Sequence, residues 1–217
     1  MTNKNNKLFI PGKAGQIEAI LDIPENSNPD TMAVICHPHP LYEGTMHNKV
    51  VSTLHRVCNQ FNIPNLRFNF RGVGQSEGEY AGTEGGVEDC LAVIDYLKQN
   101  YPYKNLWILG FSFGAYVAAK TAAAIPTELL ITIAPPVGRD YFGELPERND
   151  SWILVQAKDD QVIHAQAVYD WYEGLAHKPY LISFDEAGHF FHGKLIPLRE
   201  KIVEAIESFH ALEVYQQ

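Results

Sequence analysis

A short segment near the middle of the chain has the residue types and spacing of a turn that carries a catalytic serine. It reads Gly110-Phe111-Ser112-Phe113-Gly114, the Gly-x-Ser-x-Gly pattern, with apolar residues before it and small residues after it. In this pattern the serine stands on a sharp strand-to-helix turn, where a Cβ on either glycine would come too close to neighbouring chain. The turn also places the Phe113 amide at a helix start, where it can bind a developing oxyanion. The spacing predicts Ser112 as a nucleophile and the Phe113 amide as an oxyanion donor.

Five histidines follow the serine, and one of them is placed to act as its base. A serine hydroxyl is a weak nucleophile until a neighbouring base takes its proton. His189 comes after an apolar segment and a short Asp-Glu-Ala-Gly turn, which would put it at the carboxyl edge of a sheet. We expect His189 to be the base, and His192 stays open on spacing. The other candidates are His164, His177 and His210.

Two adjacent aspartates follow another apolar segment and could orient the imidazole of the base. Residues 152–157 read as a buried strand, and Asp159 and Asp160 lie just beyond its end. A carboxylate at this place could hold the imidazole in one tautomer. The local residues do not separate Asp159 from Asp160, and either could cap the helix expected from Ala165.

The nine histidines also raise the hypothesis of a metal site. His37 and His39 are two residues apart, and His189 and His192 are three apart, which are spacings that zinc sites use. Prolines on either side of His39 stiffen the first pair, and the role of a base accounts for His189. We therefore expect neither a metal nor another cofactor.

Apolar and amphipathic segments alternate along the chain and would position these groups. We predict strands at 8–10, 17–23, 32–36, 66–70, 106–109, 129–134, 152–157 and 180–184, and helices at 50–61, 87–97, 113–124, 165–175 and 196–212. This alternation predicts an α/β fold with a mostly parallel central sheet and helices on both faces. Ligands of such sheets bind at the carboxyl ends of the strands, where the candidate residues fall.

Length and composition favour one globular domain. The chain has 217 residues, of which 46% are hydrophobic and 20% are charged. We expect a single domain over residues 8–217 and a flexible N-terminus over the polar, Asn-rich residues 1–7. No apolar run approaches the roughly 18 residues that span a bilayer, and no apolar stretch of signal-peptide length follows Lys4 and Lys7.

Charge and cysteine content narrow the partners and the compartment. A net charge of −9 would repel nucleic acid and anionic membranes, so we expect neither as a partner. Cys36, Cys58 and Cys90 fall within predicted strands and helices, which favours reduced, buried thiols and a cytoplasmic location. The sequence does not predict an oligomeric state.

Three motifs together resemble the α/β-hydrolase superfamily over residues 8–212. They are the Gly110–Gly114 turn, the Asp159-Asp160 loop and Ala187-Gly188-His189. The His-Pro-His-Pro sequence within 36–46 and Arg-Phe-Asn-Phe-Arg-Gly within 66–78 resemble a small bacterial branch without a cap domain, with dienelactone-hydrolase-like proportions. The resemblance implies the α/β-hydrolase fold and a serine-esterase-like activity.

The resemblance also implies which aspartate acts and which amides form the oxyanion hole. Members place the acid between a small residue and a Val or Ile, and Ala157, Asp160 and Val162 match that spacing, which selects Asp160. The residue after a His-Gly pair supplies the second oxyanion amide in most members, which nominates His39. Proline stands where that glycine is usual, so the amide of Leu41 is the alternative.

An open site and a small-molecule substrate follow from the same resemblance. Residues 135–150 are too few to form the helical cap that many members insert at this point. We expect Leu41, Tyr42 and Phe190 to line the pocket, and a small or medium carboxylic ester, thioester or lactone to be the substrate. The alternatives are a catalytically idle binding protein with this fold, or a peptidase or amidase that uses the same three residues.

Overall fold

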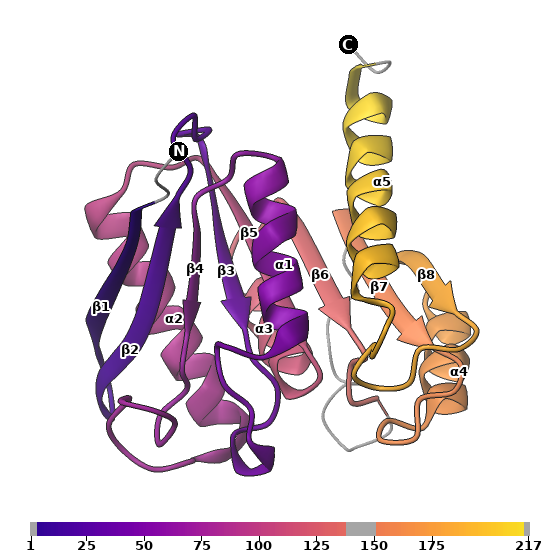
Figure 1. Ribbon diagram of the computed structural model, residues 1–217, viewed down its shortest axis with the longest axis horizontal. Coiled ribbons are helices and arrows are strands. Elements are labelled where there is room, and N and C mark those ends of the chain that lie inside the picture. Colours follow the sequence, from indigo (N-terminus) through magenta and orange to yellow (C-terminus); the bar gives the residue numbers. More distant parts are fainter. Residues whose placement is uncertain (1–3, 138–150, 215–217) are drawn as a thin grey trace.

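The apolar segments form one sheet (Figure 1). The structure is a computed structural model, and it describes residues 4–137 and 151–214 of the chain. Within these residues the sheet has eight strands in the order β1-β2-β4-β3-β5-β6-β7-β8. The strands are β1 (Lys4–Gly12), β2 (Gly15–Ile23), β3 (Thr31–Cys36), β4 (Asn65–Phe68), β5 (Asn105–Phe111), β6 (Leu129–Ile133), β7 (Ser151–Ala157) and β8 (Tyr180–Phe184). Strand β2 runs antiparallel to β1 and β4, and the pairs from β4 to β8 are parallel. The predicted, mostly parallel sheet is confirmed.

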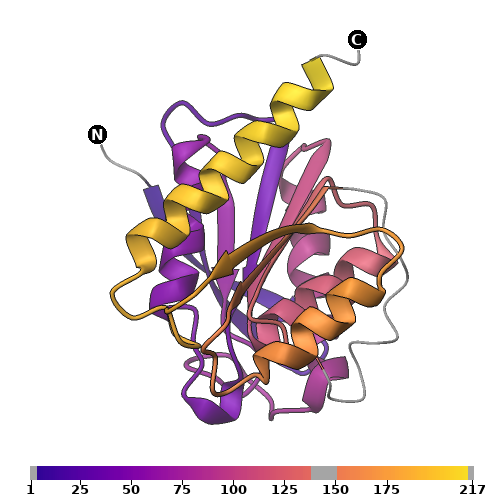
Figure 2. The same ribbon diagram turned by 90° about the vertical axis from the view of Figure 1, so that its right-hand side faces the viewer.

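Helices cover both faces of this sheet. The helices α1 (Lys49–Gln60) and α5 (Leu195–Val214) lie on one face, and α2 (Gly82–Asn100), α3 (Phe113–Ala124) and α4 (Ala165–Gly174) lie on the other (Figures 1 and 2). Each layer has its own buried apolar cluster against the sheet. The α/β architecture with two helical layers is therefore confirmed.

Strand β5 shows how the sequence pattern serves both layers. Leu106 and Ile108 pack in the cluster beneath α2 and α3, whereas Trp107, Leu109 and Phe111 pack in the cluster beneath α1 and α5. A strand with apolar residues in every position is expected where both faces of a sheet are covered. Ser112 follows directly at the carboxyl end of this central strand.

The first strand begins earlier than the apolar pattern predicts. Lys4–Lys7, which we expected within a flexible N-terminus, pair with Ile20–Ile23 of β2 as the first residues of β1. Asn6 and Lys7 are exposed, so backbone pairing extends the hairpin without an apolar residue to reveal it. Residues 1–3 of that predicted segment lie outside the described residues.

Strand β4 ends two residues before its predicted end because polar contacts take the chain out of the ladder. The Asn69 side chain donates to Glu18 at 2.8 Å and accepts from the Met46 amide at 2.9 Å. The Phe70 amide donates to the ring of His37 at 3.0 Å. The Asn69 amide still donates to the Glu18 carbonyl of β2 at 2.9 Å, so it is at Phe70, bonded to His37, that the chain leaves the sheet.

The segment between β6 and β7 bears on the prediction that the chain has no cap. Residues 138–150, most of that predicted short connection, lie outside the described residues.

None of the helices in the described ranges is long and apolar enough to cross a membrane.

Candidate active site

Ser112 stands on a strained turn between β5 and α3. Its backbone angles are φ 53° and ψ −120°, a conformation that non-glycine residues rarely adopt. A Cβ on Gly110 would lie 2.1 Å from the Gly114 carbonyl oxygen, and one on Gly114 would lie 2.3 Å from the Cys36 carbonyl oxygen. The two glycines are therefore required by the close approach of the turn to its own helix and to β3.

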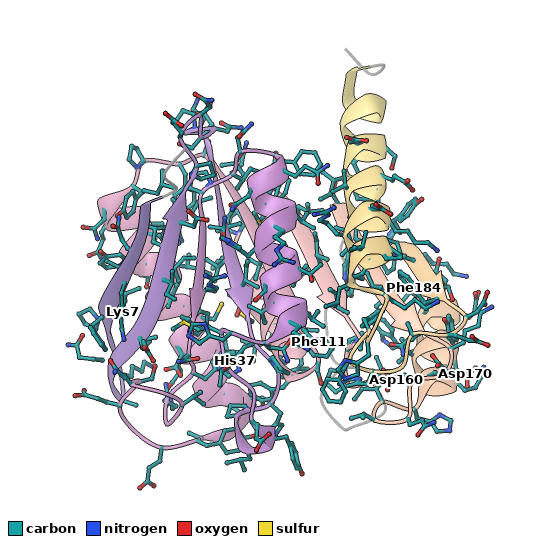
Figure 3. All side chains as sticks on the ribbon, viewed as in Figure 1. Lys7, His37, Phe111, Asp160, Asp170 and Phe184 are labelled. Atoms are coloured by element: carbon teal, nitrogen blue, oxygen red, sulfur yellow. The ribbon has the colours of Figure 1, made fainter. Side chains whose placement is uncertain are left out.

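The structure brings three of the predicted side chains into hydrogen-bonding contact. His189 Nε2 lies 3.2 Å from Ser112 Oγ, and His189 Nδ1 lies 2.8 Å from Asp160 Oδ2. The side chains of His189 and Asp160 are 4% and 0% exposed. In Figure 3, Asp160 lies toward the same end of the sheet as Phe111, the last residue of β5, and His37. The carboxyl edge thus gathers a hydroxyl, an imidazole and a carboxylate in one line.

The carboxylate of Asp160 is held by donors on both oxygens. Oδ1 accepts from the amides of Val162 at 2.9 Å and Ile163 at 2.8 Å, and Oδ2 accepts from the side chain of Gln156 at 3.4 Å as well as from His189. Burial raises the pKa of Asp160, but hydrogen bonds from His189 and the two amides outweigh it and lower that pKa below the ordinary value. Asp160 is therefore a fixed carboxylate at neutral pH.

Asp159 has a different task from its neighbour. Its Oδ1 accepts from the amides of Ala187 and Gly188, each at 2.9 Å. These two hydrogen bonds lower the pKa of Asp159. One aspartate thus contacts the imidazole, and the other fixes the backbone just before His189.

The ring of His189 packs against two phenylalanines, and the other histidines considered as the base lie elsewhere. The rings of Phe111 and Phe190 each have their centroids 5.0 Å from that of His189. His192 stacks against Phe190 at 5.9 Å, and His164 caps α4 by accepting from the Ala167 amide. Of the histidines that spacing left open, His189 is the one in contact with Ser112.

His37 joins the loop after β3 to the loop after β4. It is fully buried, its Nε2 accepts from the Phe70 amide at 3.0 Å, and its Nδ1 donates to the Pro38 carbonyl at 2.6 Å. Burial lowers the pKa of His37 to about 3, despite the opposing effect of the Pro38 carbonyl. The ring is therefore neutral, with its proton on Nδ1, and it holds the segment that leads to His39.

The contacts of the loop at His39 bear on the choice of the second oxyanion donor. The Leu41 amide donates to Nδ1 of the His39 ring at 3.2 Å, so this amide already has a partner. A Cβ on Gly44 would lie 2.1 Å from the Pro38 carbonyl oxygen, which shows how tightly the loop folds back. The bond from its amide to the His39 ring argues against Leu41 as the second oxyanion donor.

A pocket of about 270 Å³ opens beside Ser112. Of the three predicted lining residues it includes Tyr42, whereas Leu41 is 65% exposed and Phe190 packs on the ring of His189. The lining residues are His39, Tyr42, Tyr80, Thr83, Ser112, Phe113, Tyr116, Pro136, Val162 and Ile163. The walls are therefore mainly aromatic and aliphatic.

The metal hypothesis finds no cluster to support it in the described part of the chain. Within it, no three His, Cys, Asp or Glu side chains are grouped so that they could hold a metal ion. Both ring nitrogens of His37 and of His39 take part in hydrogen bonds with the protein. Cys36, Cys58 and Cys90 are free and buried.

The sequence reasoning missed two polar side chains at the site. Gln156 is fully buried in β7 and donates to Asp160, and its signal was a polar residue within an otherwise apolar strand. The Tyr80 hydroxyl lies 3.1 Å from His39 Nε2. No pattern marks Tyr80, because it comes from an irregular loop whose course the sequence does not predict.

Comparison with known proteins places this geometry in a family. Residues 41–148 match the family described as serine aminopeptidase S33. The structure resembles that of XC6422 from Xanthomonas campestris, an α/β serine hydrolase without a lid, with 36% identity over 96% of each chain and a TM-score of 0.90. It also resembles an α/β serine hydrolase homologue from Coxiella burnetii, with 38% identity over 94% of this chain and 98% of that one and a TM-score of 0.89.

A curated relative extends the same likeness. The uncharacterized protein RP471 of Rickettsia prowazekii (strain Madrid E) is 35% identical over an alignment of 199 residues that covers 87% of this chain and 83% of the relative. Identities above 30% over most of both chains, together with the shared sheet, establish common descent. The chain belongs to the α/β-hydrolase superfamily, in the bacterial branch of serine hydrolases without a lid.

Proposed function

We propose that this protein cleaves small or medium carboxylic esters through Ser112 as nucleophile, His189 as base and Asp160 as the acid that orients the base. The observation that carries the proposal is the line of hydrogen bonds from Asp160 through His189 to Ser112 Oγ, beside an apolar pocket. Thioesters and lactones fall within the same proposal, because their carbonyl carbons react with a serine in the same way.

In the first half of the reaction the serine is acylated. Nε2 of His189 takes the proton of Ser112 Oγ as this oxygen attacks the ester carbonyl carbon. The negative charge on the carbonyl oxygen is then held by the amides of Phe113 and His39. Phe113 is the first residue of α3, so no carbonyl lies four residues earlier within that helix to accept from its amide. One such donor lowers the barrier by about 3 kcal/mol.

The acyl-enzyme forms and is then released by the same groups. The tetrahedral intermediate collapses, the carbon–oxygen bond to the alcohol breaks, and the imidazolium gives its proton to the departing oxygen. Water enters, gives a proton to His189 and attacks the acyl carbon. Collapse of the second intermediate frees the carboxylic acid and returns the proton to Ser112.

Asp160 contributes by keeping the imidazole in the reactive tautomer. A carboxylate at 2.8 Å from Nδ1 holds the proton on that nitrogen and leaves Nε2 able to accept one. Its lowered pKa keeps it ionised through the pH range in which esterases are assayed. It also stabilises the imidazolium that forms during each half of the reaction.

The pocket supports an esterase over the alternatives. An aminopeptidase must hold the ammonium group of its substrate, and none of the described lining residues is an aspartate or a glutamate. A catalytically idle binding module would not need a serine in the strained conformation of Ser112. The substrate is thus a small ester-like molecule. The cytoplasmic location inferred from the sequence is a separate expectation and stays a prediction.

Hydrolysis of 4-nitrophenyl acetate tests the proposal. The wild-type protein should release 4-nitrophenolate with saturation kinetics, and Ser112→Ala should lower kcat/KM by about 10⁴-fold or more. Ser208→Ala, which changes a serine on α5, is the matched control and should keep wild-type activity. Equal activity in Ser112→Ala, or no hydrolysis of esters and thioesters by the wild-type protein, would contradict the proposal.

A further inference from the structure

Among the described residues, those that line the pocket beside Ser112 come from segments other than the one that carries the base. Its walls come from the loop at His39 and Tyr42, the start of α2, the start of α3 and the loop at Val162 and Ile163. No described residue of the segment 185–193, which carries His189, lines it. The pocket and the base therefore face different substituents of the reacting carbon.

This asymmetry assigns the pocket to the acyl part of the substrate. In the proposed reaction the departing oxygen receives its proton from His189 Nε2, so the alcohol part must lie toward the imidazole. The remaining substituent of the carbonyl carbon is the acyl chain, which then extends away from His189. The pocket on that side is the space that receives it.

The pocket is suited to an uncharged group. Among its described lining residues none is Asp, Glu, Lys or Arg. Arg71, from the same loop as Tyr80, is 8% exposed and is bound to Asp89 through Nε at 3.0 Å and Nη2 at 2.8 Å. A carboxylate on the acyl chain would lose its hydration here and find no group of opposite charge among the described lining residues.

Aromatic rings form most of one wall, and the His39 ring packs against three of them. The His39 ring has its centroid 4.9 Å from that of Tyr42, 5.1 Å from that of Tyr80 and 5.0 Å from that of Phe113. Since the Leu41 amide donates to Nδ1, the neutral His39 ring carries its proton on Nε2 and donates it to the Tyr80 hydroxyl. Rings fixed before binding lose little freedom when a flat group packs against them.

The volume sets the size of that group. About 270 Å³ corresponds to roughly nine water molecules at about 30 Å³ each. An acyl group of about ten non-hydrogen atoms, such as 3-phenylpropanoyl, has that size. A long fatty acyl chain exceeds it.

We propose that the pocket selects an uncharged acyl group that bears an aromatic ring, as in esters of arylacetic and 3-arylpropanoic acids. This inference rests on the proposed function and names the substrate class of the same site. In this inference the rings of Tyr42, Tyr80 and Phe113 pack against the aromatic ring of the acyl group, so that selectivity exceeds what the size of the pocket alone would give.

Two esters of equal size and equal leaving group isolate the aromatic contribution. They are 4-nitrophenyl 3-phenylpropanoate and 4-nitrophenyl 3-cyclohexylpropanoate. The wild-type kcat/KM should be about three- to tenfold higher for the phenyl ester, which is the gain expected from aromatic pairs beyond burial of area. The enzyme should hydrolyse the anionic mono-4-nitrophenyl adipate at least about tenfold more slowly than 4-nitrophenyl heptanoate.

Substitutions in the aromatic wall should change the phenyl-to-cyclohexyl ratio. In Tyr80→Leu and in Tyr42→Leu the ratio should fall toward one, and because both esters are measured on the same variant, a general loss of activity cancels. Tyr42 is 79% exposed, so Tyr42→Leu should fold normally. It keeps the test usable if Tyr80→Leu does not fold. Tyr180→Leu, at the opposite end of β8 from the site, is the matched control and should keep the wild-type ratio.

The outcomes separate this inference from the proposed function. A wild-type ratio of one or less, or a ratio that neither leucine variant changes, would overturn the aromatic selection. If hydrolysis of the two esters still required Ser112 in that case, the proposed function would be retained and only the proposed selection of an aromatic acyl group would be wrong. Absence of Ser112-dependent hydrolysis for every ester would overturn both.

Discussion

At the scale of single residues, the pair Asp159 and Asp160 shows how neighbours in sequence take separate tasks. Asp160 contacts the imidazole of His189, whereas Asp159 accepts from the Ala187 and Gly188 amides. The two side chains of a dipeptide at a strand end point in different directions, so one can serve the ring and the other the backbone beside it. Substituting each aspartate in turn separates the tasks.

Asp160→Asn should lower kcat/KM for 4-nitrophenyl acetate by about 10⁴-fold, because an amide no longer fixes the reactive tautomer or stabilises the imidazolium. Asp159→Asn is the matched control and should cost about tenfold or less, since it weakens two backbone contacts of an exposed carboxylate. Steady-state kinetics of both variants check this order. A larger loss of kcat/KM in Asp159→Asn than in Asp160→Asn would show that Asp159, and not Asp160, orients the base.

Gln156 is a positioning residue behind this acid. Its buried amide donates to Asp160 Oδ2 at 3.4 Å and to the Ala157 carbonyl at 2.9 Å. Gln156→Leu fills nearly the same volume but removes one donor to a charged group, so kcat should fall about tenfold with little change in KM. Gln166→Leu, on the exposed side of α4, is the control. An unchanged kcat in Gln156→Leu would show that the contact does not serve the acid.

The sequence predicted the chemistry of these residues better than their supporting contacts. Ser112 and His189 could be singled out because a strained turn demands glycines at fixed spacing and because the base must follow a strand. Asp160 could be separated from Asp159 by resemblance alone. Gln156 and Tyr80 were missed because their roles depend on which loop packs beside which strand, and periodicity carries no information on that packing.

At the scale of elements, the turn between β5 and α3 is limited by space around its second glycine. A Cβ on Gly114 would lie 2.3 Å from the Cys36 carbonyl oxygen, a backbone atom of β3 that cannot move without shifting the strand. The turn therefore depends on the strand beside β5 in the sheet as well as on its own residues. Substituting this glycine tests how strictly the packing is fixed.

Gly114→Ala should lower the free energy of unfolding by about 2 kcal/mol or more, because the added methyl forces β3 and α3 apart. Gly174→Ala, in α4, meets nothing within 4 Å and should be neutral or stabilise the protein by about 0.5–1 kcal/mol. Urea unfolding of both variants measures the difference. Equal stability of the two variants would contradict the close approach.

Element boundaries show where the sequence pattern stops being informative. The central strands could be predicted because both faces are covered, so their apolar runs are continuous. The start of β1 at Lys4 and the end of β4 at Phe68 could not, since hairpin pairing sets the first and the bond of the Phe70 amide to His37 accompanies the second. Backbone pairing and side-chain bridges between distant loops leave no periodic trace in the chain.

At the scale of the whole molecule, buried neutral histidines make stability depend on pH. His37 has a folded pKa of about 3, and burial also lowers the pKa of His55, against its hydrogen bond to Asn65. In the unfolded chain a histidine titrates near 6.5, so below that pH the unfolded state binds a proton that the folded state excludes. Stability is therefore full at higher pH and falls as the pH drops below about 6.5.

The free energy of unfolding should fall by about 2 kcal/mol between pH 7.5 and 5 from His37 alone, and His55 adds to the loss. Urea titrations across this range measure the slope. His37→Gln should show a smaller slope than the wild-type protein, whatever its absolute stability, and His55→Gln provides a second comparison. A wild-type stability that is flat from pH 7.5 to 5 would contradict buried, neutral rings.

The fold as a whole brings together side chains from three strand ends, and the proposed activity depends on their joint action. Treatment with a fluorophosphonate, followed by intact mass and peptide mapping, tests it most directly, because the reagent reacts with an activated serine. We expect one adduct per chain, on Ser112. It should form much more slowly in His189→Ala and should not form in Ser112→Ala. An unlabelled wild-type protein, or an adduct that persists in Ser112→Ala, would contradict the account.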